Sequence, residues 1–174
     1  MMTFRWLGLA GIMWALLACS GTPETKISRT SSNPPPHNYV GIQIPPMPEG
    51  SQTELGYLLE TENPGKFSIE VVNVGSLKAV WMGSFLYHDD QGKAHWKVIA
   101  ALPPRPLPEG YYFSSGNCMN RGNAQPEIVA IIKKEDKKML TGIKKAWRAD
   151  PQKKHFEELP PAGIQCINEG WNSL

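Results

Sequence analysis

The sequence predicts an α+β domain, in which an antiparallel sheet of about five or six strands carries one main helix on one face. Phe67, Ile69 and Val71 alternate with period two, as the core-facing residues of a strand do. Two apolar segments flank a charged tip at residues 89–92, as the strands of a hairpin do. Near the C-terminus the apolar period changes to that of a helix. A pure β-sandwich is the alternative fold.

Most of the sheet is expected in the first half of the domain. A short strand closed by prolines is predicted within residues 38–50, and a hairpin over 54–75 turns at residues 63–65, Asn-Pro-Gly. A second hairpin is predicted over residues 78–102, where apolar and aromatic side chains occupy both the odd and the even positions of the two strands. Filling of both faces is typical of central strands. We therefore expect this second hairpin at the centre of the sheet.

The second half begins with a proline-rich segment, residues 103–110, which is expected to be a stiff connector. The run EIVAII at 127–132 predicts a compact buried strand. The last residues, 163–171, are expected to add one more short strand.

The main helix is predicted between Asp136 and Pro151. Asp136 is a suitable N-cap and Pro151 a suitable stop. Between them, an apolar stripe with helical spacing is formed by Met139, Leu140, Ile143 and Trp147. The helix is expected to pack on the sheet through this stripe.

The first residues carry the features of an export signal. Arg5 supplies one positive charge, and an apolar run follows from Trp6 to Leu17. That run of about twelve residues suits a signal peptide and is shorter than the roughly 20 residues that span a bilayer. It ends in the four residues Leu16, Leu17, Ala18 and Cys19.

This segment resembles the signal peptide and lipobox of bacterial lipoproteins. The resemblance implies a signal peptide over residues 1–18, cleavage before Cys19, a diacylglycerol on its sulfur and usually an acyl chain such as palmitate on the new amino terminus. Lipids of this kind hold a protein on its membrane, because each buried methylene contributes about 0.8 kcal/mol. Ser20 is not the Asp that commonly retains such proteins in the inner membrane. The resemblance therefore implies a cell-envelope location, on the periplasmic face of the outer membrane.

Composition divides the rest of the chain into two parts. Residues 19–38 are rich in Ser, Thr, Asn and Pro, which predicts a lipidated flexible tether. Residues 39–174 are long enough for a single globular domain. The whole chain has a formal charge of only +2, so no nucleic-acid partner is expected.

The cysteines are interpreted in the light of that compartment. With Cys19 carrying lipid, Cys118 and Cys166 remain as an even pair in an oxidising environment, and we predict a disulfide between them. The surrounding segments, CMNRGN and CINEGWN, are expected to be matched turns at its two ends. A reactive thiol is the alternative, but neither residue belongs to a C-x-x-C pair or adjoins a histidine.

Little in the sequence indicates catalysis, a cofactor or a metal. His88, Asp89, Asp90 and His95 surround a hairpin tip but lack a zinc-type spacing, so metal binding there stays open. The sequence contains no G-x-S-x-G elbow, no Gly-rich phosphate loop and no H-E-x-x-H. We predict neither catalytic residues nor a cofactor.

A binding surface is expected beside the disulfide, where aromatic and polar residues would gather. Its candidates are Tyr111, Tyr112, Asn120, Arg121, Asn168 and Trp171. Aromatic rings add contact area with little entropy to lose, so the surface suits an envelope protein or glycan. The alternative is that these rings belong to the core.

The functional prediction is a membrane-anchored envelope lipoprotein that acts as a non-catalytic binding or assembly partner. Two alternatives come from other classes. One is an inhibitor of an exogenous hydrolase such as lysozyme, and the other is an envelope hydrolase that processes glycans, which would need convergent titratable groups in a cleft.

Overall fold

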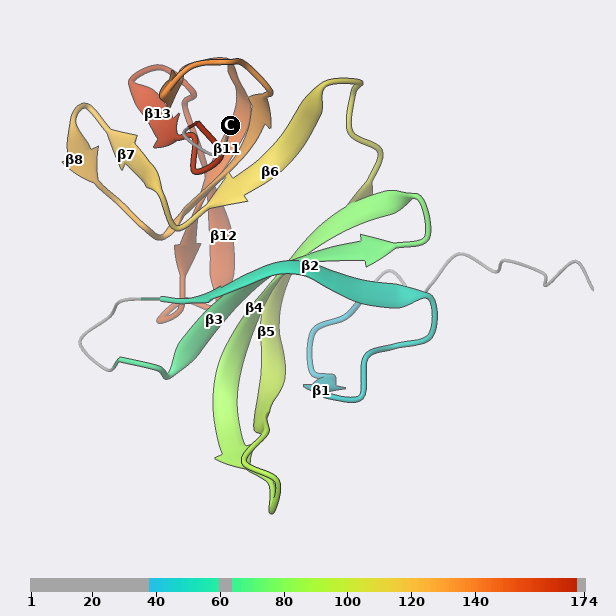
Figure 1. Ribbon diagram of the computed structural model, residues 1–174. Helices are drawn as coiled ribbons and strands as arrows, with labels where there is room; N and C mark the ends of the chain where they lie inside the picture. The colour runs from blue at the N-terminus through green and yellow to red at the C-terminus, as the bar shows by residue number, and fades with distance from the viewer. Residues whose placement is uncertain (1–37, 60–63, 172–174) are drawn as a thin grey trace, which may run out of the picture. The chain divides into compact units, whose positions relative to one another are not determined.

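The computed structural model describes residues 38–59 and 64–171, and every regular element in this part of the chain is a β-strand. The strands form three antiparallel sheets (Figure 1). Among the described residues no helix has the length and apolar character needed to cross a membrane. The predicted signal peptide, the lipidation site Cys19 and the tether up to residue 37 lie outside the described residues.

Sheet A has the strand order β1-β5-β4-β3-β2. Its strands are β1 (Gln43–Ile44), β2 (Ser51–Leu58), β3 (Phe67–Val74), β4 (Leu77–His88) and β5 (Ala94–Arg105). The two predicted hairpins are confirmed as the pairs β2–β3 and β4–β5. β4 lies at the centre, between β3 and β5, as its filling on both faces predicts. The stiff connector is shorter than predicted, because β5 continues through Pro103 and Pro104.

The remaining strands form two four-stranded sheets. Sheet B has the order β12-β11-β9-β6, with β6 (Tyr111–Ser115), β9 (Ile128–Lys133), β11 (Ile143–Asp150) and β12 (His155–Leu159). Sheet C has the order β10-β13-β7-β8, with β7 (Cys118–Asn120), β8 (Asn123–Ala124), β10 (Met139–Leu140) and β13 (Ile164–Ile167). The strand expected near the C-terminus is therefore present as β13.

Sheet B is buried on both faces. On β9, Val129 and Ile131 pack in a cluster with sheet A, whereas Ile128, Ala130 and Ile132 pack in a second cluster with sheet C. Alternate residues of a strand point to opposite faces, so a strand between two apolar layers needs a continuous apolar run. This position explains why EIVAII contains no polar residue after Glu127.

The other face of sheet A is covered by the chain before β2. Tyr39 and Ile44 are buried there against Val72, Trp81 and Val98. The rings of Tyr39 and Trp81 have their centroids 4.8 Å apart. Segment 38–47 thus acts as an apolar cover, and sheet A also has residues buried on both faces.

The predicted main helix is wrong, and with it the α+β fold. The segment forms β10 and β11 instead, and the all-β alternative is closer, although three sheets are present. Ile143 and Trp147 do not share a face, because Ile143 packs toward sheet C and Trp147 toward sheet A. The pairing of β11 with β9 shifts register between Ile143 and Lys145. This irregularity, with burial on both faces, hides the period of two and imitates helical spacing.

Candidate binding groove

A groove with a volume of about 820 Å³ runs along β6, and we call it the β6 groove. One wall is β6 itself, preceded by Gly110. Leu55 on β2 and Val71 on β3 contribute the surface of sheet A. The rest is formed mainly by the segments 134–136 and 167–170. Four parts of the chain that are separated in sequence therefore meet at one site, and its volume is typical of ligand-binding clefts.

The two tyrosines at the start of β6 point to opposite faces of sheet B. Tyr111 packs against the cluster shared with sheet A, and Tyr112 against the cluster shared with sheet C. Both are half-buried and line the groove. The ammonium group of Lys144 lies 5.5 Å from the centroid of the Tyr111 ring. Burial raises the pKa of Tyr112, and the carboxylate of Glu169 adds to this effect.

Asn168 holds together the wall opposite β6, which is formed by segments 134–136 and 167–170 and which we call the far wall. Its side-chain nitrogen donates hydrogen bonds to the carbonyl oxygens of Glu135 (3.2 Å) and Lys137 (3.1 Å). Its side-chain oxygen accepts one from the backbone nitrogen of Gly170 (3.2 Å). Asn168 therefore fastens the 134–138 segment to the C-terminal residues, so its amide is largely occupied with shaping the wall.

The other three candidate residues do not line the groove. Asn120 ends β7, and Arg121 is exposed at the tip between β7 and β8. Trp171 is 38% exposed and its backbone nitrogen donates to the carbonyl of Asn168 (3.1 Å), so it adjoins the far wall without lining the groove. The structure thus brings Tyr111, Tyr112 and Asn168 together and separates them from the β7–β8 tip.

The predicted disulfide between Cys118 and Cys166 is present, with a distance of 3.9 Å between the Cα atoms. The two residues face each other on β7 and β13, and both are buried between sheets B and C. The flanking segments are consequently paired strands at the cysteines, and not only the matched turns that the repeated outline indicates. The bridge holds β13, whose last residue, Ile167, begins the far wall of the groove.

Among the groove residues that sequence reasoning missed, three shape its walls and its apolar surface. Asn117 joins the two walls: its side-chain oxygen accepts from the hydroxyl of Ser114 (2.9 Å), and its nitrogen donates to the carbonyl of Ile167 (2.9 Å). Leu55 and Ile167 are 39% and 40% exposed, which is unusual for large apolar side chains inside a concave site. The Ser-Gly-Asn sequence before Cys118, which is typical of a turn, was a usable signal for Asn117. No local pattern distinguishes Leu55 or Ile167 from core residues.

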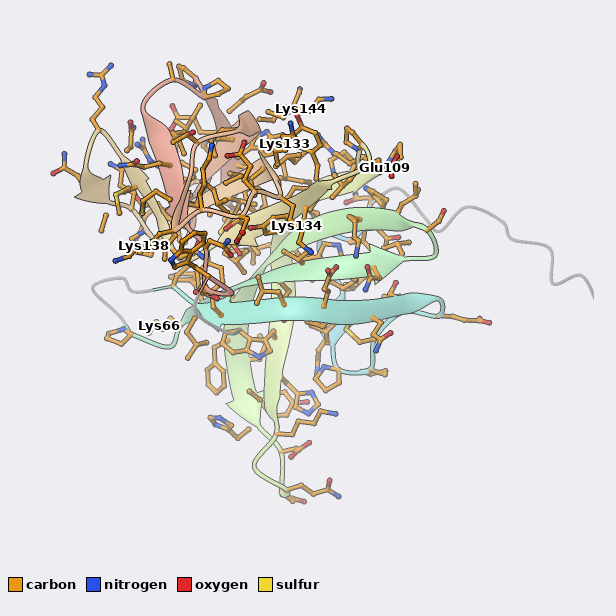
Figure 2. All side chains as sticks on the ribbon, turned by 45° about the horizontal axis from the view of Figure 1, so that its top comes forward. Lys66, Glu109, Lys133, Lys134, Lys138 and Lys144 are labelled. Carbon is orange, nitrogen blue, oxygen red and sulfur yellow. A yellow bond between two sulfur atoms is a disulfide. The ribbon has the colours of Figure 1, made fainter. Side chains whose placement is uncertain are left out.

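The charges that line the groove are predominantly negative. Among the described residues that line it, Lys134 is the one cationic side chain, against the four carboxylates of Glu54, Glu135, Asp136 and Glu169. Glu54 pairs with Lys78, and Glu135 lies 3.0 Å from the ammonium group of Lys137. Figure 2 shows Lys133 and Lys144 close together, with Lys134 below them. The groove is therefore a polar-rimmed cleft with an excess of carboxylates in its wall.

The hairpin tip does not gather the four residues considered as metal ligands. His95 stacks on Tyr87 and donates a hydrogen bond from Nε2 to the carboxylate of Asp89 (3.1 Å). His88 is adjacent to Tyr87 in the strand, so it points to the other face, where its ring contacts Phe85. In the described parts of the chain, no group of three or more His, Cys, Asp or Glu side chains is placed to hold a metal ion.

The chain matches no protein-family model, no curated protein and no solved structure with which it was compared.

Proposed function

We propose that the protein is a membrane-anchored envelope lipoprotein and that it binds another envelope component through the β6 groove, as a partner in assembly and without catalysis. The anchor rests on the lipobox-like residues that end at Cys19. The binding role rests on one observation: a groove of about 820 Å³ exposes large apolar side chains from two different sheets, Leu55 and Ile167. Exposed apolar surface is costly in water unless a partner covers it, and such surfaces commonly mark interaction sites.

The polar surroundings support a specific partner. Asn117 and Asn168 fix the backbone around the groove, so the site is preorganised and loses little conformational entropy on binding. Half-buried tyrosines supply contact area that can also hydrogen-bond. These features suit an envelope protein or a glycan. A partner on the same membrane would meet the groove at the high local concentration that anchoring provides.

Site-specific photocrosslinking tests the proposed binding role. A benzoylphenylalanine placed at Leu55, inside the groove, is expected to yield a discrete adduct with an envelope component in living cells. The matched control places the same probe at Glu158, which is exposed on β12 at the opposite edge of sheet B. Equal adducts from both positions, or none from Leu55, would contradict a partner at the groove.

The anchor is tested separately by metabolic labelling with palmitate. The wild-type chain should incorporate the label and fractionate with membranes, and Cys19→Ser should do neither. Labelling that survives in Cys19→Ser would place the lipid elsewhere and overturn the proposed anchor.

A second candidate, a hydrolase inhibitor, is favoured by the β7–β8 tip. Arg121 and Gly122 form a two-residue connection that is exposed, and the disulfide at Cys118 supports its base. Rigid loops of this kind can occupy a cleft with little loss of entropy. An inhibition assay with lysozyme and a panel of envelope hydrolases would reveal this activity. It should disappear in Arg121→Ala and persist in Leu55→Ser, whereas the groove proposal expects the reverse for partner binding.

A further inference from the structure

The open edge of β6 carries the further inference. In the described chain β6 pairs with β9 on one side only. The nitrogen of Lys134 donates to the carbonyl of Gly110 (2.7 Å), so the hydrogen-bonded pairs of this antiparallel ladder continue at Tyr112 and Ser114. The main-chain groups of Phe113 and Ser115 therefore point to the opposite edge, which lines the groove. Within the described residues, no hydrogen bond uses them.

This edge lacks the features that usually prevent strand pairing. β6 has the sequence YYFSS, without charge, proline or register shift. By contrast, β12 at the other edge of sheet B carries two glutamates, and β2 at the edge of sheet A carries Glu54 and a register shift between Thr53 and Leu55. Charges and bulges of this kind keep an edge unpaired. β6 is shielded instead by its position inside the groove, where Phe113 and Ser115 are only 5% and 7% exposed, so its edge is accessible only through the groove.

The walls indicate what that strand carries. Side chains of an added strand alternate between the two faces of sheet B. Those on one face would meet Leu55 and Val71, and those on the other would meet Ile167. Both faces of the strand should therefore be apolar or small at its centre. Glu54 and Glu135 already pair with Lys78 and Lys137, so Asp136 and Glu169, against Lys134, are the lining charges that favour a cationic residue at the ends of the segment.

We infer that the β6 groove binds an extended polypeptide segment of a partner protein, with an apolar centre and flanking basic residues, which adds to sheet B as a strand beside β6. The inference rests on the proposed function and specifies its partner as a protein segment. Main-chain hydrogen bonds to Phe113 and Ser115 would provide affinity, and the side-chain contacts would provide selectivity. β6 has five residues, so the paired length is about 17 Å.

The test measures amide hydrogen exchange in the full chain, labelled with ¹⁵N. The probe is a capped octapeptide of alternating valine and threonine with a lysine at each end. On binding, exchange at the amides of Phe113 and Ser115 should slow by about tenfold or more, because each becomes hydrogen-bonded. The amides of Tyr112 and Ser114 are internal controls, since the ladder with β9 already protects them.

Two comparisons isolate the main-chain bonds. Ser115→Pro removes an outward donor without removing a bond to β9, and it should weaken binding by about tenfold. Glu158→Pro is the matched control, because residue 158 also points its main chain outward, on the opposite edge. It should leave peptide affinity unchanged. A peptide N-methylated at its four central residues should not bind, and one with glutamate ends should bind more weakly.

Other outcomes overturn the inference in distinguishable ways. Peptide binding without protection at Phe113 and Ser115, or equal binding of the N-methylated peptide, would show recognition by side chains alone. Protection that grows with protein concentration and needs no peptide would show that a second copy fills the groove. Protection that is independent of both would show that another part of the same chain fills it. If no peptide binds while the Leu55 crosslink persists, strand addition fails and the proposed function stands.

Discussion

The hydroxyl of Tyr57 donates a hydrogen bond to the carbonyl oxygen of Pro126, at a distance of 2.8 Å. Tyr57 is on β2 of sheet A, and Pro126 precedes β9 of sheet B. The bond therefore joins two of the three sheets that contribute to the β6 groove. Burial raises the pKa of Tyr57 well above its usual range, so the phenol stays protonated and remains a donor.

Removing this hydroxyl should destabilise the domain. Tyr57→Phe is expected to lower the free energy of unfolding by about 1 kcal/mol, because the carbonyl of Pro126 loses its partner in a half-buried place. Urea unfolding followed by tryptophan fluorescence measures the loss. The control is Tyr87→Phe, whose ring is 47% exposed and which should lose less than about 0.5 kcal/mol. Equal losses in the two variants would show that the hydrogen bond between the sheets does not contribute measurably to the free energy of unfolding.

Gly116 should tolerate alanine poorly because of the same tyrosine. Its φ is +81°, and a Cβ atom would lie 3.2 Å from the ring of Tyr57. Gly92 has a similar φ of +77° with nothing within 4 Å of the added atom. Gly92→Ala should therefore cost about 1 kcal/mol from backbone strain alone. Gly116→Ala should cost about 1 to 3 kcal/mol more, from overpacking. Thermal unfolding compares the two, and equal costs would refute close packing of Tyr57 on Gly116.

Glu70 provides a pH-dependent test of sheet A. Burial raises the pKa of its carboxyl, and a hydrogen bond from the hydroxyl of Thr53 (2.9 Å) partly opposes this. Because the folded pKa exceeds the unfolded one, this group's contribution to stability is present below about pH 4.3 and is lost as the pH rises through the folded value. Thr53→Val should raise the pKa of Glu70 further.

Carboxyl ¹³C NMR measures this titration directly. Asp89 is the internal control, because hydrogen bonds from His95 and from the backbone of Lys93 lower its pKa. The Asp89 titration should be identical in the wild-type chain and in Thr53→Val. A Glu70 pKa that does not change in the variant would show that the Thr53 hydroxyl does not stabilise the carboxylate.

The disulfide should matter most for sheet C. It closes a loop between residues 48 positions apart, which corresponds to about 4 kcal/mol in the chain-entropy model. The double variant Cys118→Ala, Cys166→Ala should lose up to that amount in urea unfolding. The strands of sheet C have only two to four residues, so few other interactions hold them.

Hydrogen exchange locates the effect of that double variant. Amides of Met119 and Gln165 should lose protection first, while Val72 and Trp81 in sheet A keep theirs until global unfolding. Uniform loss of protection across all three sheets would contradict a local role and show that the bridge stabilises the domain only as a whole.

Local patterns predicted the elements whose two faces differ or whose turns are explicit. The β2–β3 hairpin was predicted from the period of two at Phe67, Ile69 and Val71 and from the Asn-Pro-Gly sequence, and the structure confirms the pairing of β2 with β3. The β4–β5 hairpin follows from its charged tip, where the side chain of Asp89 accepts hydrogen bonds from the backbone of Gln91 and Lys93. The disulfide was predicted because two cysteines remain once Cys19 is assigned to the lipid, and because the inferred compartment is oxidising.

The error in β11 has a definite cause. Ala146 and Trp147 are adjacent and both buried, one toward sheet C and the other toward sheet A. A strand covered on both faces shows no alternation, and the register shift after Ile143 removes the remaining regularity. Helical spacing was then the best match to a pattern that has no single apolar face.

The sequence by itself determined the hairpins, the buried strand β9, the cysteine pairing and an N-terminal segment that resembles a lipoprotein signal, because each depends on residues close together or on a count. Only the tertiary structure decided that three sheets form and that β6 has an open edge. It also decided that Leu55, Tyr112 and Ile167 line one groove. Strand pairing and sheet stacking depend on contacts between segments that are distant in sequence. A local apolar pattern predicts that a side chain is buried, but it does not predict which segment covers that side chain.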